Sequence, residues 1–158
     1  MRYYGFGNYY LSSIQQGIQS AHCIADILVK YPTDVHQSMS SRNWAINHKT
    51  IILLNGGNKQ SLFELSTFLD SPHNPYPWGS FHEDQQSLNE CLTHVGIILP
   101  ESVYSAAELI RKRIVTLTQH DDNYKLFYKE YPQPAYEDEF SNWELQLILK
   151  LNGCGLAN

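Results

Sequence analysis

Two glutamines and a histidine near the start of the chain carry polar groups that could contact a substrate. Gln15, Gln19 and His22 are separated by four and three residues, so on an α-helix they share one face. Amides donate hydrogen bonds to oxyanions, and an imidazole can orient or deprotonate water. The row predicts either a substrate-contacting face or a hydrated surface that bonds to neighbouring loops.

A glycine-rich segment, 55–58, followed by Lys59, joins a predicted strand to a predicted helix. Free backbone N–H groups at such a junction, together with a lysine, can hold a phosphate. Glycine is also the residue that a tight turn requires for its dihedral angles. We keep both interpretations, a tight turn or a site for a small anionic or nucleotide-like ligand. The segment does not match a Walker A sequence.

Histidines and acidic residues cluster in the sequence without a metal-binding pattern. His82, Glu83 and Asp84 are consecutive, and His73 and His94 are near them in the sequence, but no spacing matches a zinc motif. The three cysteines are widely separated and form no C-x-x-C pair, which favours reduced, small buried side chains. The sequence therefore predicts no metal site and no cofactor.

The glutamine row requires a helix to present it. Ser12 and Ser13 each precede a glutamine by three residues, a capping-box pattern that predicts a helix start, and Pro32 ends the helix. Apolar residues recur along this helix at spacings of four, three, four and three, which predicts a single stripe facing the core. That stripe consists of Ile14, Ile18, Ala21, Ala25 and Leu28.

The other elements follow from apolar runs bounded by turn residues. The run at 50–54 is continuously apolar or β-branched, which is typical of a strand covered on both faces, and 31–41 predicts a loop. We expect strands at 2–6, 50–54, 78–82 and 92–99, helices at 61–69, 87–91, 102–117 and 142–151, and an irregular segment at 124–139.

This order of elements predicts an α/β fold with a mixed four-stranded sheet, helices packed on it and two C-terminal helices. We expect residues 1–100 to form the α/β domain. Residues 101–158 are expected to form a helical extension that packs on the same domain, because its helices have apolar faces to bury.

The segment 11–22, which follows the first strand, resembles the helix-opening motif of class II peptidyl-tRNA hydrolases. Members of that family show Gly-Lys, small residues and then Gln-x-x-His here, and Gln19, Ala21 and His22 match this pattern. The strand at 49–54, the helix at 61–69 and the segment 78–100 also resemble the family in order. The resemblance covers about two-thirds of the chain and implies hydrolysis of the ester between peptide and tRNA.

The resemblance also implies candidate site residues. The family's lysine corresponds to Gln15, and its acidic and hydroxyl partners correspond most nearly to Asp84 and Thr93, with Glu83 competing. In this interpretation His22 or Asp84 orients or deprotonates water. The donors to the oxyanion are Gln15, Gln19 or Thr93. The catalytic candidates are thus His22, Asp84 and Thr93, and the substrate-binding candidates are Gln15, Gln19 and Lys59.

Composition limits the partners of the protein. The net charge of −5 repels polyanions, and no basic tail offsets it, because both 1–100 and 101–158 carry more acidic than basic side chains. The longest apolar runs fall far short of the roughly 20 residues that cross a bilayer, and the N-terminus lacks the apolar region of a signal peptide. We expect a cytoplasmic protein without a membrane partner.

Three functions remain open at this point. The first is a divergent peptidyl-tRNA hydrolase-like enzyme acting on peptidyl-tRNA or a related ester. The second is a catalytically degenerate relative that binds a nucleotide-like ligand or a partner protein through the same cleft. The third is a structural or regulatory oligomer, such as a homodimer, built through the aromatic N-terminus and the C-terminal helices. Tyrosines at 3, 4, 9 and 10 could stack on bases or form core and oligomer surface.

Overall fold

A computed structural model describes residues 1–118 and 140–157, except for the side chains of 87–88 and 112–118. The described chain divides into two units, Met1–Glu101 with Cys154–Asn158, and Ser102–Gly153. The segment 124–139, predicted to be irregular, lies outside the described residues. The packing of the helical extension on the first domain stays a prediction.

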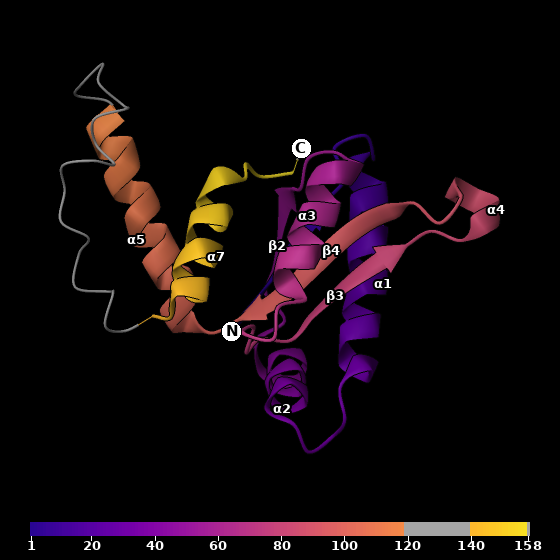
Figure 1. The fold of residues 1–158 in the computed structure, drawn as a ribbon, viewed down its shortest axis with the longest axis horizontal. Helices are drawn as coiled ribbons and strands as arrows, with labels where there is room; N and C mark the ends of the chain where they lie inside the picture. Colours follow the sequence, from indigo (N-terminus) through magenta and orange to yellow (C-terminus); the bar gives the residue numbers. More distant parts are fainter. Residues whose placement is uncertain (119–139, 158) are drawn as a thin grey trace. The chain divides into compact units, whose positions relative to one another are not determined.

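Within the described residues of the first unit, four strands form one mixed sheet (Figure 1). The strand order is β2-β1-β4-β3, in which β1 pairs in parallel with β2 and antiparallel with β4, and β4 pairs antiparallel with β3. This confirms the predicted α/β class and its mixed four-stranded sheet. The strands are β1 (Arg2–Gly7), β2 (Ile51–Asn55), β3 (Trp78–His82) and β4 (Leu92–Leu99).

The helices of the first unit lie between successive strands. They are α1 (Ser13–Lys30), α2 (His36–Asn43), a turn of π-helix called η1 (Trp44–His48), α3 (Lys59–Leu69) and α4 (Gln85–Leu88). The second unit contains most of α5 (Glu101–Thr118) and α7 (Asn142–Gly153), which match the two C-terminal helices expected from the sequence.

Part of the loop expected at 31–41 is helical. Helix α2 is polar and has no apolar stripe from which a helix could be predicted. Its anchor is instead the buried indole of Trp44, whose Nε1 donates to the carbonyl of Thr50 at 3.1 Å. One aromatic side chain thus fixes a helical segment that periodicity does not predict.

The connections between strands bring three strand ends to one edge of the sheet. Strands β1, β2 and β3 all run in the same direction, because β1 and β3 are both antiparallel to β4. The chain moves outward from β1 to β2 through α1, and then across the sheet to β3 through α3. Right-handed connections in opposite directions place their helices on opposite faces. Figure 1 shows α3 in front of the sheet and α1 behind it.

We call the edge where β1, β2 and β3 end the carboxyl edge; β4 begins there. Both α1 and α3 start beside it, since each follows a strand that ends there. In open α/β sheets, ligands bind at this edge, where successive connections leave in opposite directions. The topology therefore directs the search for a site to residues near Gly7, Asn55, His82 and Leu92.

Three glycines aligned across the sheet let α1 approach closely. Gly5 pairs with Gly96, and Gly96 pairs with Gly79, in a row across β1, β4 and β3. A Cβ at Gly96 would lie 2.3 Å from the hydroxyl oxygen of Tyr3, and one at Gly79 would lie 2.8 Å from Ile27 on α1. The absence of side chains in this row makes room for the Tyr3 ring and for the helix.

The predicted core stripe of α1 is wrong. Ile14 is 76% exposed and Ile18 is 49% exposed, while the helix buries a neighbouring face. The rotation of α1 follows from its second half, where Cys23 and Ile27 pack with Tyr3, Trp44 and Ile98 in one buried core cluster. The buried residues of α1 are Gln16, Gln19, Ser20, Cys23 and Ile27.

The expectation that the second strand is covered on both faces is also wrong. Strand β2 lies at the edge of the sheet, and of its residues only Leu54 is buried. The C-terminal tail pairs with its outer side: Asn55 N–H donates to Gly155 O at 2.9 Å, and Ala157 N–H donates to Leu53 O at 3.1 Å. The strand buried along its whole length is β4, in the centre of the sheet.

Candidate functional site

The start of α1 is closed by a capping box at the carboxyl edge. Gln15 N–H donates to Ser12 Oγ at 3.3 Å, and Ser12 N–H donates to Gln15 Oε1 at 3.0 Å. These reciprocal bonds satisfy backbone donors at the helix start. The carbonyl of the Gln15 side chain is therefore engaged in capping, and its amide NH₂ is the group left to meet a ligand from this exposed position.

One turn further along α1, a buried amide holds a carboxylate. Gln19 Nε2 donates to Glu83 Oε1 in a short contact that joins α1 to the residue just after β3. Gln19 is 7% exposed and Glu83 is partly exposed, so the carboxylate is anchored from inside and still reaches solvent. The backbone N–H of Glu83 also donates to Cys91 O at 3.0 Å. The acidic residue attached to the glutamine row is therefore Glu83.

His22 lies on the same side of the sheet as this pair. Its ring stacks on Phe81 with centroids 4.7 Å apart and an interplanar angle of 15°. Phe81 and Glu83 are two residues apart, so their side chains point to the same face of β3 and its extension. The structure thus brings together Gln19, His22 and Glu83 beside the carboxyl edge, with the imidazole exposed to solvent.

The other two catalytic candidates occupy different environments. Thr93 is buried, and its hydroxyl donates to Phe81 O at 3.4 Å where the register of β3 and β4 shifts. This bond connects the two strands and directs the hydroxyl into the protein. Asp84 is exposed in the segment after β3, and its backbone carbonyl accepts from Glu90 N–H at 3.4 Å.

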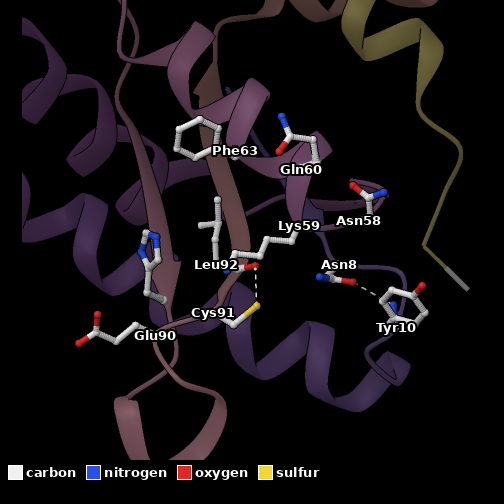
Figure 2. Close-up of a pocket in the computed structure, with 10 residues that line it drawn as sticks. Asn8, Tyr10, Asn58, Lys59, Gln60, Phe63, Glu90, Cys91 and Leu92 are labelled. Atoms are coloured by element: carbon white, nitrogen blue, oxygen red, sulfur yellow. Dashed lines mark hydrogen bonds between the residues drawn. The ribbon is translucent and has the colours of Figure 1, made fainter.

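An open pocket of about 720 Å³ lies at the carboxyl edge on the α3 side (Figure 2). Lys59, the remaining substrate-binding candidate, begins α3 and extends across this pocket. The neighbouring Asn58 caps the helix, because its Oδ1 accepts from Ser61 N–H at 3.0 Å. The lining residues are Asn8, Tyr10, Asn58, Lys59, Gln60, Phe63, His82, Glu90, Cys91 and Leu92.

Alternation along β3 separates this pocket from the Gln19–Glu83 pair. His82 lines the pocket, whereas Phe81 and Glu83, its neighbours in sequence, meet α1. Successive side chains of a strand point to opposite faces of the sheet. The carboxyl edge therefore carries two separate regions, the α1 side with the amide–carboxylate pair and the α3 side with the open pocket.

Beneath α1 lies a buried polar cluster that sequence reasoning missed. His94 Nε2 and the hydroxyl oxygen of Tyr3 are 3.0 Å apart, and both side chains are fully buried. Within the described residues, no hydrogen-bond partner meets His94 Nδ1, Gln16 Oε1 or Gln19 Oε1. Glycines at alternate strand positions, at 5, 7 and 96, could have signalled this close approach.

Burial shifts the titration of this cluster away from neutral pH. Removal from water lowers the pKa of His94 to about 4, so its imidazole is neutral. Burial also raises the pKa of the Cys23 thiol to about 12, and burial followed by the nearby Cys23 raises the pKa of Tyr3. The cluster is therefore uncharged at physiological pH and forms hydrogen bonds without supplying a charge.

Several features common to other kinds of site are absent from the described part of the chain. It contains no group of three or more His, Cys, Asp and Glu side chains that could hold a metal ion. None of its helices has both the length and the apolar character needed to span a membrane. Comparison with known proteins finds no matching family model and no matching curated protein.

Proposed function

We propose that this protein is a divergent peptidyl-tRNA hydrolase-like enzyme that acts on peptidyl-tRNA or a related ester. The observation that carries the proposal is the bond from the Gln19 amide to the Glu83 carboxylate, next to the exposed imidazole of His22. A carboxylate held in place and open to solvent can orient a water molecule. The resemblance of 11–22 to the class II family supplies the substrate class.

In this mechanism Glu83 accepts a proton from water while the water oxygen forms a bond to the ester carbonyl carbon. The resulting oxyanion collapses, the bond to the ribose oxygen breaks, and that oxygen takes the proton back. Donors near the carbonyl stabilise the oxyanion. Exposed donors on α1 include the Gln15 amide and the His22 imidazole, and Gln19 acts as a positioning residue for Glu83.

A second candidate function is binding without turnover, by a catalytically degenerate relative that holds a nucleotide-like ligand or a partner protein. The observation that favours it is the capping role of Gln15, which occupies the place of the family lysine. A neutral amide does not neutralise phosphate, and polyanion affinity depends largely on Lys and Arg. Lys59, which lines the open pocket, offers a cation at this edge.

The test is hydrolysis of an N-acetylated aminoacyl-tRNA by the purified protein. Glu83→Gln should lower kcat/KM at least about 100-fold, the usual range for losing a general base. Glu64→Gln is the matched control, because Glu64 also accepts a bond from a glutamine amide, that of Gln60 at 3.0 Å. It should leave the rate unchanged.

Two further variants separate the candidate residues. His22→Ala should reduce the rate, whereas Asp84→Asn should have a smaller effect than Glu83→Gln. Turnover absent at high enzyme concentration, with Gln15→Lys failing to produce it, would reject the enzyme and favour the binding function. Activity that appears only with Gln15→Lys would show that the missing cation limits the natural protein.

The proposal includes a cytoplasmic location, tRNA or a nucleotide-like ligand as the partner, and a homodimer as the assembly. The exposed apolar side chains of α1, Ile14 and Ile18, support self-association. Light scattering over a range of concentrations tests the dimer, and a monomer at every concentration would exclude it.

A further inference from the structure

Two exposed aromatic rings stand at opposite margins of the α3-side pocket. Tyr10, from the loop between β1 and α1, is 76% exposed, and Phe63 on α3 is 59% exposed. Figure 2 shows their rings on either side of Lys59. Large exposed rings at a concave site offer flat apolar surfaces on which a base can stack.

The loop that carries Tyr10 is held in place. Asn8 Oδ1 accepts from Tyr10 N–H at 3.1 Å, and Tyr9 N–H donates to Gly57 O at 3.0 Å, which ties this loop to the segment before α3. The rings of Tyr9 and Tyr10 contact each other with centroids 4.0 Å apart. Tyr10 is thus positioned before any ligand arrives.

Polar groups in the pocket are divided between two ends. Lys59 provides a positive charge and extends across the pocket toward Leu92, and Asn8 and Gln60 line the side near the start of α3. Glu90 lies toward the other end, with its carboxylate directed away from Lys59 (Figure 2). A lysine binds phosphate as a point charge. A carboxylate at a distance from that charge accepts hydrogen bonds from hydroxyl groups. The ligand that suits this arrangement has an anionic group, hydroxyl groups and a flat ring.

We propose that this pocket binds one nucleotide, with its phosphate at Lys59, its base against Tyr10 or Phe63 and its ribose toward Glu90. A volume of about 720 Å³ is within the range of small-molecule sites. The inference deepens the proposed function by naming what the α3 side recognises, and it rests on that function for the substrate class. A free nucleoside monophosphate and the terminal nucleotide of an RNA share this chemistry.

The experiment is calorimetric titration of the full chain with adenosine 5′-monophosphate, ribose 5-phosphate and inorganic phosphate. The monophosphate should bind most tightly. Tyr10→Leu should weaken its binding by about five- to 150-fold, the effect of losing one base–aromatic stack, while Tyr10→Phe keeps the ring and should bind as the natural protein does. Equal affinity for the monophosphate and ribose 5-phosphate would overturn the base contact.

A second pair of variants tests the phosphate contact. Lys59→Ala should weaken binding and reduce its dependence on salt, whereas Lys49→Ala, which removes another exposed lysine that does not line the pocket, should do neither. Equal effects of the two substitutions, or no binding of the monophosphate at millimolar concentration, would overturn the proposal.

Further measurements distinguish an RNA end from a free nucleotide as the ligand. They also test nucleotide binding independently of hydrolysis. Tighter binding of a trinucleotide ending in 3′-adenosine supports an RNA end as the ligand, and equal binding supports the free nucleotide. Glu83→Gln should keep nucleotide affinity. If the natural protein shows no turnover but the pocket variants bind the nucleotide more weakly than it does, nucleotide binding is supported and hydrolysis is not. If turnover is present and these variants alter neither turnover nor nucleotide binding, the inference fails alone.

Discussion

The two helices that flank the sheet bury opposite kinds of side chain. α3 follows the ordinary pattern, since Leu62, Leu65 and Leu69 recur on one face and are buried. The first two turns of α1 instead bury Gln16 and Gln19, while apolar side chains on the same helix face solvent. The α3 side has an apolar layer and an open pocket at its edge. The α1 side has a polar layer that ends at the carboxylate of Glu83, which accepts a hydrogen bond from Gln19.

On the α1 side, polar side chains that hold other groups in position lower the free energy of unfolding. A buried polar atom without a partner costs about 1–3 kcal/mol, and Gln16 Oε1, Gln19 Oε1 and His94 Nδ1 have none among the described residues. Leucines at these positions on α1 would bury surface without that cost. Gln19 orients Glu83, and the Tyr3 hydroxyl meets the neutral imidazole of His94. Apolar side chains cannot fill these roles. Strain or unmet hydrogen bonds of this kind concentrate at functional sites.

The largest expected difference between the two sides is in their response to acid. The pKa of His94 is about 4 in the folded protein and about 6.5 when unfolded, so below pH 6.5 the unfolded chain gains a proton that the folded chain does not. The free energy of unfolding should therefore fall between pH 6.5 and 4, by an amount approaching about 3 kcal/mol. Urea denaturation at several pH values measures it, with His94→Asn as the reference.

The free energy of unfolding of His94→Asn should depend less on pH between 6.5 and 4, because this variant lacks the buried imidazole. Substitution of the exposed His73 should leave the pH dependence of the free energy of unfolding unchanged. Equal slopes for the natural protein and His94→Asn would show that the α1 side is not the acid-sensitive one.

The next effect concerns the glycine row under α1. Gly96→Ala places a methyl group 2.3 Å from the Tyr3 hydroxyl oxygen, so the ring must move out of its buried position. Overpacking of this kind destabilises by about 1–3 kcal/mol, and the midpoint of thermal unfolding should fall. Gly17→Ala is the control, since nothing apart from its sequence neighbours and the backbone of its own helix lies within 4 Å of the added Cβ on the exposed side of α1.

The control substitution should raise stability by about 0.5–1 kcal/mol, because alanine favours the helix interior over glycine. Opposite signs for the two glycine substitutions are thus the expected result. A stability gain in both would mean that the α1 side is packed more loosely than the distances indicate.

The smallest effect is expected at the start of α3. Asn58→Ala removes the side-chain oxygen that accepts from Ser61 N–H, and loss of such a cap costs about 1 kcal/mol. Asn58→Asp should retain the cap and the stability. Denaturation of the two variants checks this, and equal stability would show that the α3 start does not depend on its cap.

Local signals in the sequence were sufficient for most elements. The capping serines before α1, the prolines near 32 and 77 and the apolar run of β4 predicted these boundaries closely. The helix expected at 61–69 begins earlier, at Lys59, because Asn58 provides its cap. The alternation of strands and helices also predicted the mixed sheet, because right-handed connections leave few topologies. The sequence alone identified Gln15, Gln19 and His22 as one helical row, since their spacing depends only on helix geometry.

Only the tertiary structure decided which face of α1 is buried, which acidic residue meets it and which strand lies at the edge. Periodicity gives the angles between side chains on a helix, but the rotation of the helix depends on partners such as Tyr3, Trp44 and Ile98, which are distant in sequence. The pairing of Gln19 with Glu83 spans 64 residues, and the pocket combines four separate segments. Such contacts are set by how the chain folds back on itself, which no local pattern records.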